Sequence, residues 1–307
     1  MAAPEQEEQR HIPIITAVHP ENKAYFKEIA APKKVIREGR SKIAVSCSQC
    51  MKPSSNGAEL LKCSKCKIAW YCSRECQKAQ WPTHKKVCKE ASSSMPKFLG
   101  SFIANPLLNH TLQVPFVLAF DLRKNPILDQ PLIARCDVQI EPSDMTYIMS
   151  LAFGRMSPAE LAKGTEGMLQ VKTFIPLDAE KAIDITRMEV WKNTKYPNKE
   201  RGFAGNPTVL VDFHMKGTKQ TITYGLVIED SAIERVKAGA GFAMQSAIFG
   251  GQTEVPLTTQ ACLDFINMHI RADKKNQLRL RTHMTKEDVD NYRNAVSGDD
   301  EQPDKSE

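Results

Sequence analysis

Eight metal-binding side chains between residues 47 and 88 constrain this chain more than any other feature. Seven of its nine cysteines lie there with one histidine, in four pairs: Cys47-x2-Cys50, Cys63-x2-Cys66, Cys72-x3-Cys76 and His84-x3-Cys88. A two-residue gap lets a tight turn aim both sulfurs at one ion, and a three-residue gap places two ligands on one helix face. Eight soft ligands are what two closed tetrahedral zinc sites need, with no position left for water or substrate. The spacing therefore predicts two structural Zn²⁺ ions per chain.

A disulfide framework is the alternative use of so many cysteines, but it requires an oxidising compartment. Residues 1–10 are acidic and polar and contain no apolar signal segment. We therefore expect an intracellular protein, of the cytoplasm or the nucleus, whose thiols stay reduced. The two other cysteines, Cys136 and Cys262, are isolated in the sequence. Both are expected to be small buried apolar residues.

Length and composition indicate one sizeable globular domain with a small module attached. The chain has 307 residues, of which 41% are hydrophobic and 25% charged, so a packed core is expected. No apolar run approaches the roughly 18 residues of a membrane-spanning helix, which predicts no membrane partner.

The net charge of +6 is unevenly distributed. Residues 31–91 contain 14 Lys and Arg against 4 Asp and Glu, so the remaining residues sum to about −4. Such a surplus suggests nucleic-acid binding. However, seven thiolates with two Zn²⁺ ions carry a charge of about −3, which the lysines also offset. We therefore expect a solvated basic face rather than phosphate contacts.

Composition divides the chain into five segments. Residues 1–42 form a lead-in, partly disordered, with a short helical pattern at 20–30. The cysteine module spans 43–91, and the small polar residues 92–96 form a linker that ends in proline. Residues 97–295 form a domain of unknown role. Residues 296–307 form an acidic tail that is expected to be disordered.

The large domain combines strand and helix patterns. Apolar residues recur at helical spacing in 98–122, with a kink at Pro115. Alternation predicts a half-buried strand at 132–140 and further strands at 168–175, 185–192, 208–215 and 220–228, with a turn at 216–219. Helices are then expected from a cap at Asp230 or Ser231 to Gly239, from a Thr258 cap to residue 272, and from a Thr285–Asp288 capping box to about 294. Antiparallel strands with helices at the ends indicate an α+β domain.

The complete ligand pattern resembles the MYND-type zinc finger. The resemblance covers residues 47–88 and includes Tyr71 before Cys72, Gln77 after Cys76, and Trp81. It implies that the ligand pairs interleave. Cys47, Cys50, Cys72 and Cys76 would hold one zinc ion, and Cys63, Cys66, His84 and Cys88 the other. It also implies a helix at 74–90 with Pro82 near a break. About 40 residues cannot bury a core of their own, so the ions would supply the folding energy. The rest of the chain is only faintly similar to uncharacterised C-terminal regions of fungal MYND-containing proteins.

MYND modules dock peptides, including proline-rich segments, so the resemblance implies a protein or peptide partner. The residues that line the family's groove correspond to Ser64, Gln77 and Trp81. An indole packs well against proline, while the amide and the hydroxyl can hold the peptide backbone. The alternative for Trp81 is that it fills the small core between the metal sites. Trp70 and Tyr71 are assigned to packing.

Enzymatic functions find little support in the sequence. Some MYND modules lie within SET-domain lysine methyltransferases, but the segment before Cys47 has Gly39 as its one glycine. Asn109-His110-Thr111 resembles the Asn-His cofactor motif of those enzymes only weakly. The run 239–244 lacks the third glycine of a dinucleotide loop and reads as a connector after a helix. His110, His269 and His283 are isolated, and Asp212 and His214 alternate towards the outer face of a strand.

The sequence thus predicts an intracellular adaptor: a small interleaved two-zinc MYND finger joined to an α+β domain of antiparallel sheet with flanking helices. A SET-related lysine methyltransferase and a nucleic-acid-binding regulator are the alternative functions. No catalytic residue is assigned.

Overall fold

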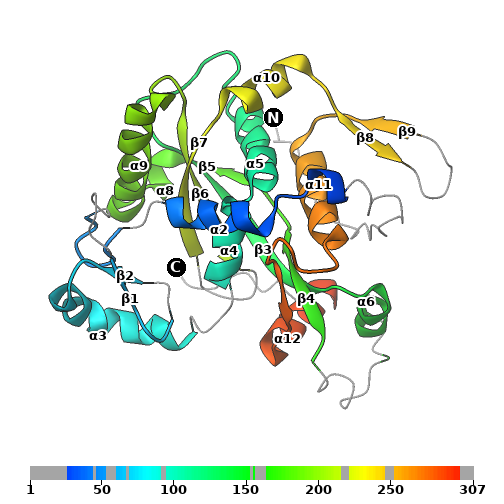
Figure 1. The fold of residues 1–307 in the computed structure, drawn as a ribbon, viewed down its shortest axis with the longest axis horizontal. Coiled ribbons are helices and arrows are strands. Elements are labelled where there is room, and N and C mark those ends of the chain that lie inside the picture. The colour runs from blue at the N-terminus through cyan, green and yellow to red at the C-terminus, as the bar shows by residue number, and fades with distance from the viewer. Residues whose placement is uncertain are drawn as a thin grey trace, which may run out of the picture.

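The computed structural model describes residues 26–43, 46–52, 60–66, 69–90, 95–152, 155, 164–215, 221–245 and 252–297. Several predictions therefore lie outside the described residues: those on residues 1–25, on 91–94, on the turn at 216–219 and on the acidic tail from 298 onward. Within the described part, a small cysteine-rich unit lies beside a larger body of sheet and helices (Figure 1). Every described helix is too short or too polar to traverse a bilayer.

The larger body is built on a six-stranded mixed sheet of order β10-β4-β3-β6-β7, with β5 also paired to β3. Its strands are β3 (Leu132–Pro142), β4 (Glu166–Val171), β5 (Ile175–Leu177), β6 (Thr208–Met215), β7 (Thr221–Val227) and β10 (Arg281–His283). β3 runs parallel to β6, and the other neighbours are antiparallel. The α+β class with flanking helices is confirmed. The parallel pair was not expected, and it is possible because residues 143–207 lie between β3 and β6 and provide the long connection that parallel strands need.

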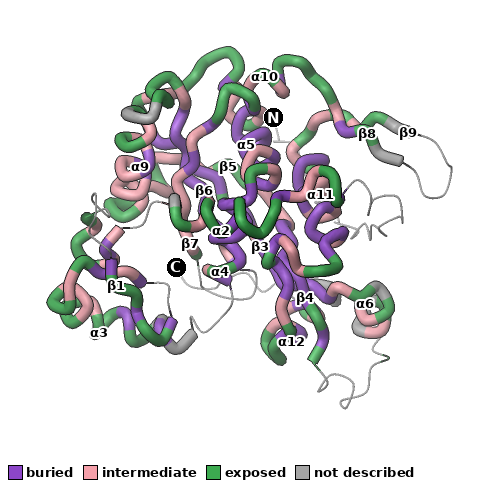
Figure 2. The backbone as a smooth tube through the Cα atoms, in the orientation of Figure 1, coloured by how far each residue is buried: buried purple, intermediate pink, exposed green. Residues whose placement is uncertain are grey.

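One face of the sheet packs against helices that supply most of the core. These are α4 (Met95–Ile103), α5 (Pro106–Ala119) and α11 (Thr259–Ala272), with α10 (Asp230–Ala238) at the side of α5. Ala134, Cys136 and Val138 alternate along β3 and are fully buried against this layer. Cys262 on α11 is buried in the same cluster, so the expectation for both isolated cysteines is confirmed. Figure 2 shows the buried backbone concentrated along the sheet and these helices.

The opposite face of the sheet is covered by α9 (Ile185–Asn198), where Trp191 packs on Ile133 and Leu210. Further along β3, Gln139 and Glu141 are also buried. The strand predicted at 132–140 is confirmed, and its outer face is accessible at Arg135 and Asp137 as expected, but Gln139 is buried and contradicts the half-buried assignment at that end. A strand in the middle of a sheet with helices on both faces has little outer surface left for solvent.

The strand predicted at 185–192 is also wrong, because these residues begin α9. Asp184 precedes the helix and accepts a hydrogen bond from the backbone N–H of Arg187 at 2.8 Å. Met188, Trp191 and Thr194 then recur every three residues, which places them on one helix face. The helix cap and this spacing determine the local structure more strongly than the short apparent alternation.

Helix ends were predicted more reliably. α10 ends where Gly239 adopts a left-handed conformation, and Thr258 caps α11 through the backbone N–H of Ala261. Thr285 and Asp288 form the expected reciprocal capping box before α12 (Lys286–Ser297). Glu229, rather than Asp230 or Ser231, precedes α10. The connector expected at 239–244 is shorter than predicted, because a strand begins at Phe242.

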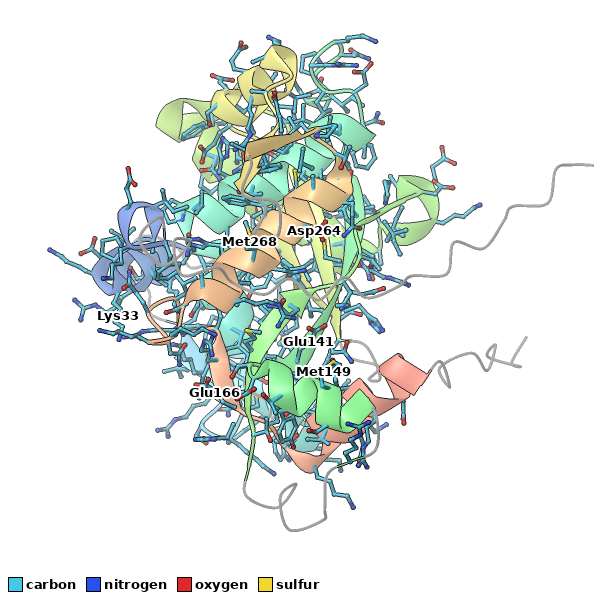
Figure 3. The ribbon with its side chains drawn as sticks, turned by 90° about the vertical axis from the view of Figure 1, so that its right-hand side faces the viewer. Lys33, Glu141, Met149, Glu166, Asp264 and Met268 are labelled. Carbon is cyan, nitrogen blue, oxygen red and sulfur yellow. The ribbon has the colours of Figure 1, made fainter. Side chains whose placement is uncertain are left out.

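The remaining elements of the larger body are short. They are α6 (Met145–Ala152), α8 (Ala179–Ala182), η1 (Lys199–Phe203), β8 (Phe242–Gln245) and β9 (Gln252–Val255). β8 and β9 pair as an antiparallel ribbon. Figure 3 labels Glu141 on β3, close to α6 and α12, whose contacts with β3 close this end of the sheet.

Residues ahead of the cysteine-rich unit belong to the larger core. Residues 26–29 form a helical turn, and α2 (Lys33–Lys42) follows. Ile36 is fully buried, and a Cβ at Gly39 would lie 2.7 Å from the backbone oxygen of Ala104, so α2 contacts α4 at backbone distance. Gln277 donates a hydrogen bond to the backbone oxygen of Ala31. The chain thus enters this core, leaves it for the cysteine-rich unit, and returns at α4, where Met95 and Pro96 form the first turn.

Candidate metal centre

The eight cysteine and histidine side chains of the small unit gather into two groups of four. In each group, the potential ligand atoms all lie within 4.8 Å of one another. The first group contains Cys47, Cys50, Cys72 and Cys76, and the second contains Cys63, Cys66, His84 and Cys88. The sets are the two that the family resemblance implied.

The distances within each group fit a tetrahedral zinc ion. Two sulfurs at about 2.3 Å from one Zn²⁺ lie roughly 3.8 Å apart, and a sulfur and an imidazole nitrogen lie about 3.6 Å apart. The distance between Cys63 Sγ and Cys88 Sγ is 3.8 Å, and that between Cys50 Sγ and Cys72 Sγ is 3.6 Å. The distance between Cys66 Sγ and His84 Nε2 is 3.5 Å. All are far longer than a disulfide bond of about 2.05 Å, so the groups have the dimensions of metal sites.

Two short turns position the first ligands of each group. Cys47 accepts a hydrogen bond on its backbone oxygen from Met51 N–H, and its own N–H donates to the oxygen of Lys52. Burial opposes ionisation of the Cys47 thiol, but backbone N–H groups, that of Cys50 first, outweigh it and lower its pKa to about 6. The backbone of this turn therefore favours the thiolate form that binds metal.

The second group shows why three thiols and an imidazole in such a small space need a cation. At Cys63, burial acts against the thiolate, yet the backbone N–H of Cys66 and the His84 ring lower its pKa to about 6. Burial and the neighbouring sulfurs of Cys63 and Cys66 raise the pKa of Cys88 to about 11. One thiolate thus hinders ionisation of the next, and a divalent ion would remove that repulsion. The donor set fits Zn²⁺.

Helix α3 (Arg74–Glu90) supplies three ligands. Cys76 lies in its first turn, and His84 and Cys88 lie in its second half, four residues apart. The expected span of 74–90 is helical throughout, with Pro82 inside the helix rather than at a gap between two helices. β1 (Leu61–Lys62) and β2 (Trp70–Tyr71) pair ahead of it and hold the second turn. Gln80 on α3 donates to the backbone oxygen of Ser48 at 2.8 Å, which ties the helix to the first turn.

Tyr71 fills the space beside the ligands. Its side chain is fully buried, and its ring meets the His84 ring edge-on at 6.2 Å between centroids. Burial first, and then the charges of Cys63 and Cys66, raise the pKa of Tyr71 to about 12. Tyr71 therefore acts as the packing residue that was predicted, whereas Trp70 is half-buried with Lys62 Nζ 4.1 Å from its ring centre.

The predicted groove residues lie on the outer surface of this unit. Trp81 is 46% exposed, so the alternative in which it fills the inner core is wrong. Its indole lies 5.9 Å from the ring of His84 and leaves its other side to solvent. Gln77, one turn earlier on α3, is half-buried, and Ser64 is exposed in the turn between Cys63 and Cys66. Side chains suited to peptide contact are thus exposed beside the second metal group.

Sequence reasoning did not find the contact between the two parts of the chain. Asn193 on α9 donates hydrogen bonds to the hydroxyl of Ser46 and to the backbone oxygen of Met51. Nothing in the local sequence marks Asn193 for this role, because its partners lie more than 140 residues away. This contact places the first turn of the small unit against the larger body (Figure 1).

The catalytic residues considered from the sequence do not form a site. Asp212 is buried rather than solvated, because Arg187 of α9 reaches it at 2.8 Å and Thr223 donates to it at 2.6 Å. His214 contacts only the Thr221 hydroxyl among its described hydrogen-bond partners. His269 is buried between the rings of Phe26 and Phe265, not at a surface.

A small depression lies at the end of the sheet near α12. It is lined by Gln139, Ile140, Met215, Asp288 and Asn291, and its volume of about 10 Å³ has room for one water molecule rather than a substrate.

Comparisons with known proteins separate the finger from the residues that follow it. Residues 47–88 match the family described as MYND finger, and they form such a finger. Residues 91–307 match the family described as Domain of unknown function (DUF8205). The chain belongs to this DUF8205 family. MYND fingers are protein-interaction modules, and here the finger precedes the DUF8205 region.

Individual relatives share only the finger region with this DUF8205 protein. Over 54 residues it is 41% identical to the human protein "Histone-lysine N-methyltransferase SMYD3", a match covering 18% of this chain and 12% of that protein. Over 87 residues it is 32% identical to "SET domain and MYND-type zinc finger protein 6" of Schizosaccharomyces pombe, covering 28% and 16%. Over 47 residues it is 51% identical to "Dauer abnormal formation protein 25" of Caenorhabditis elegans, covering 15% and 12%.

The matched part of the chain spans less than a fifth of each of these relatives. The activity in their names therefore belongs to those proteins, since the shared residues are those of the finger. No solved structure matches the chain.

Proposed function

We propose that this protein is an intracellular adaptor whose finger docks an extended, proline-containing segment of another protein. Two structural zinc ions would hold the finger together, one in each of the two groups of four ligands described above. Each group has four protein ligands, which leaves no position for a zinc-bound water, so the ions would stabilise structure rather than react. The thiols require a reducing compartment, in agreement with an intracellular site of action.

The exposed indole of Trp81 is the observation that supports docking most strongly. A tryptophan in a unit this small would normally be buried, because zinc modules have few apolar residues to spare. Here its inner edge packs beside the ligand His84 and its outer side faces solvent. Rigid aromatic side chains on a fixed scaffold are the residues that carry most binding energy at interfaces. Gln77 and Ser64 would hold the backbone of the docked segment.

Replacement of Trp81 by Ala tests this function. Binding of proline-containing peptides, measured by titration on an immobilised peptide array, should be lost, while zinc content stays at two per chain. Ala79 to Ser on the exposed side of the same helix is a matched control and should leave binding unchanged. Unchanged binding by the Trp81 variant would reject this groove.

The alternative of a lysine methyltransferase draws support from relatives' names only, and those matches cover 12% and 16% of the two relatives. Transfer of a methyl group from labelled cofactor to a histone mixture would establish it against the adaptor proposal. Nucleic-acid binding through the basic finger would instead show as salt-sensitive retention on a phosphate matrix that does not depend on Trp81.

A further inference from the structure

Exposed cations accompany Trp81 along one face of α3. Lys78 lies one turn before Trp81 and Lys85 one turn after it, at the spacings that share a helix face. Arg74 continues the row towards the start of the helix, and Lys65 follows Ser64 in the neighbouring turn. All four side chains are exposed. We call Lys65, Arg74, Lys78 and Lys85 the cationic face.

The charge on this face exceeds what the metal sites require. Residues 46–90 contain nine Lys and Arg against three Glu, while two zinc ions with seven thiolates carry about −3. Glu75 is exposed between Arg74 and Lys78 and offsets one of these charges. Within the described part of the chain, Lys85 and Lys65 have no ion-pair partner. A positive surface therefore remains around the exposed indole.

We infer that the segment docked on Trp81 carries carboxylate side chains on both sides of the residue that contacts the indole. This inference rests on the proposed docking function and specifies the chemistry of its partner. Lys78 and Lys85 are seven residues apart on a helix, about 10 Å along its axis. An extended peptide advances about 3.3 Å per residue. The two acidic residues therefore lie about three positions apart, with the prolyl or apolar contact residue between them.

The arrangement suits an acidic peptide better than a nucleic acid. Duplex-binding proteins commonly contact six to ten phosphates, so they need a long row of cations. The cationic face has four, and an apolar side chain stands in its middle with the Gln77 amide beside it. Four charges around an indole match a short segment with an apolar centre and charged flanks.

A peptide array on the full zinc-loaded chain tests this inference. Ten-residue peptides would carry two variable central positions between flanking residues three positions apart, both Glu, both Gln or both Lys. Binding that is lost in Trp81→Ala should favour Glu flanks over Gln flanks by about 5-fold, the size expected of two exposed ion pairs. The preference should shrink as salt is raised from about 0.05 to 0.5 M.

Charge reversal provides the control. Lys85→Glu should weaken the Glu-flanked peptides and strengthen the Lys-flanked ones. Lys34→Glu makes the same change at a 77% exposed position on α2, outside the finger, and should leave the preference intact. Figure 3 shows its neighbour Lys33 at the outer edge of the molecule.

The outcomes separate the inference from the proposed function. If no peptide shows Trp81-dependent binding, the docking function itself fails. If Trp81-dependent binding persists with equal affinity for Glu and Gln flanks, the carboxylate inference alone is overturned. Equal effects of Lys85→Glu and Lys34→Glu would show that the preference for Glu flanks arises from the net charge of the chain. That result would also overturn the carboxylate inference. Binding of a 20-base-pair DNA duplex that depends on Lys85 but not on Trp81 would also overturn the carboxylate inference.

Discussion

The side-chain amide of Asn193, in the middle of α9, donates a 2.9 Å hydrogen bond to the hydroxyl of Ser46, where the finger begins. A second bond from the same amide reaches the backbone oxygen of Met51 at 3.3 Å. These bonds join the first metal-binding turn to a helix of the larger body. The finger is thus held at its chain connections and also by α9, a helix remote from them in the sequence.

Replacing Asn193 with Ala should loosen the finger from α9. Two hydrogen bonds contribute about 1–2 kcal/mol, so amide exchange at residues 46–52 should quicken roughly 5- to 30-fold. Hydrogen exchange followed by mass spectrometry measures this. Asn198→Ala is the control, because among the described residues the Asn198 side chain donates within α9, to the Thr194 oxygen. Equal exchange in both variants would mean that other contacts hold the finger in place.

Loss of one thiolate should unfold the finger without unfolding the larger body. In Cys63→Ala, zinc measured by elemental analysis should fall from two per chain to one or none, since folding of the finger is coupled to metal. The main thermal transition should shift by no more than a few degrees. Cys136→Ala should do the reverse, keeping both ions while it leaves a cavity in the core. A joint collapse of both units in Cys63→Ala would show that they fold as one.

The ion pair between Arg187 and Asp212 should be needed for the stability of the α9 layer. Asp212 is buried and takes two nitrogens of the Arg187 guanidinium, which itself is about a quarter exposed. Arg187→Met leaves the carboxylate buried without a cation, and we expect a loss of about 2–4 kcal/mol in urea unfolding. Lys237→Met breaks an exposed pair with Glu234 and should cost less than about 1 kcal/mol. Similar losses in the two variants would contradict the importance of burial.

His269 should make the larger body less stable in mild acid. Burial lowers the pKa of His269 from 6.5 to about 4. The unfolded chain then gains a proton below pH 6.5 that the folded chain does not accept until about pH 4. Stability is therefore complete above pH 6.5 and falls through that window, by up to about 3 kcal/mol.

Denaturant unfolding at pH 7 and pH 4.5 measures this effect. His269→Leu should remove most of the difference and retain stability at pH 7, because the buried Nε2 atom has no partner among the described residues. His110→Gln on α5 is the control. If the Leu variant shows the same loss in acid, other groups cause it.

The finger could be predicted in detail because its structure depends on ligand spacing, which is local and visible in the sequence. The caps at Thr258 and Thr285 were visible for the same reason. What the sequence did not reveal depends on distant residues. The parallel pairing of β3 with β6 and the burial of Asp212 under Arg187 depend on which elements pack together in the folded chain. Residues 185–192 were predicted as a strand because the spacing of their apolar residues fits both the alternation of a strand and the repeat of a helix. The exposure of Trp81 was one of two alternatives until the structure distinguished them.

Because α2 packs on α4 through Gly39, both ends of the finger are fastened to the same body, like a loop inserted into it. A truncated version that begins at the first cysteine would therefore expose the apolar surface that Ile36 covers and would tend to aggregate. Deletion of residues 46–90, with a short linker that joins α2 to α4, would instead keep both helices in the larger body. It would yield the DUF8205 region as an independent object for biochemistry.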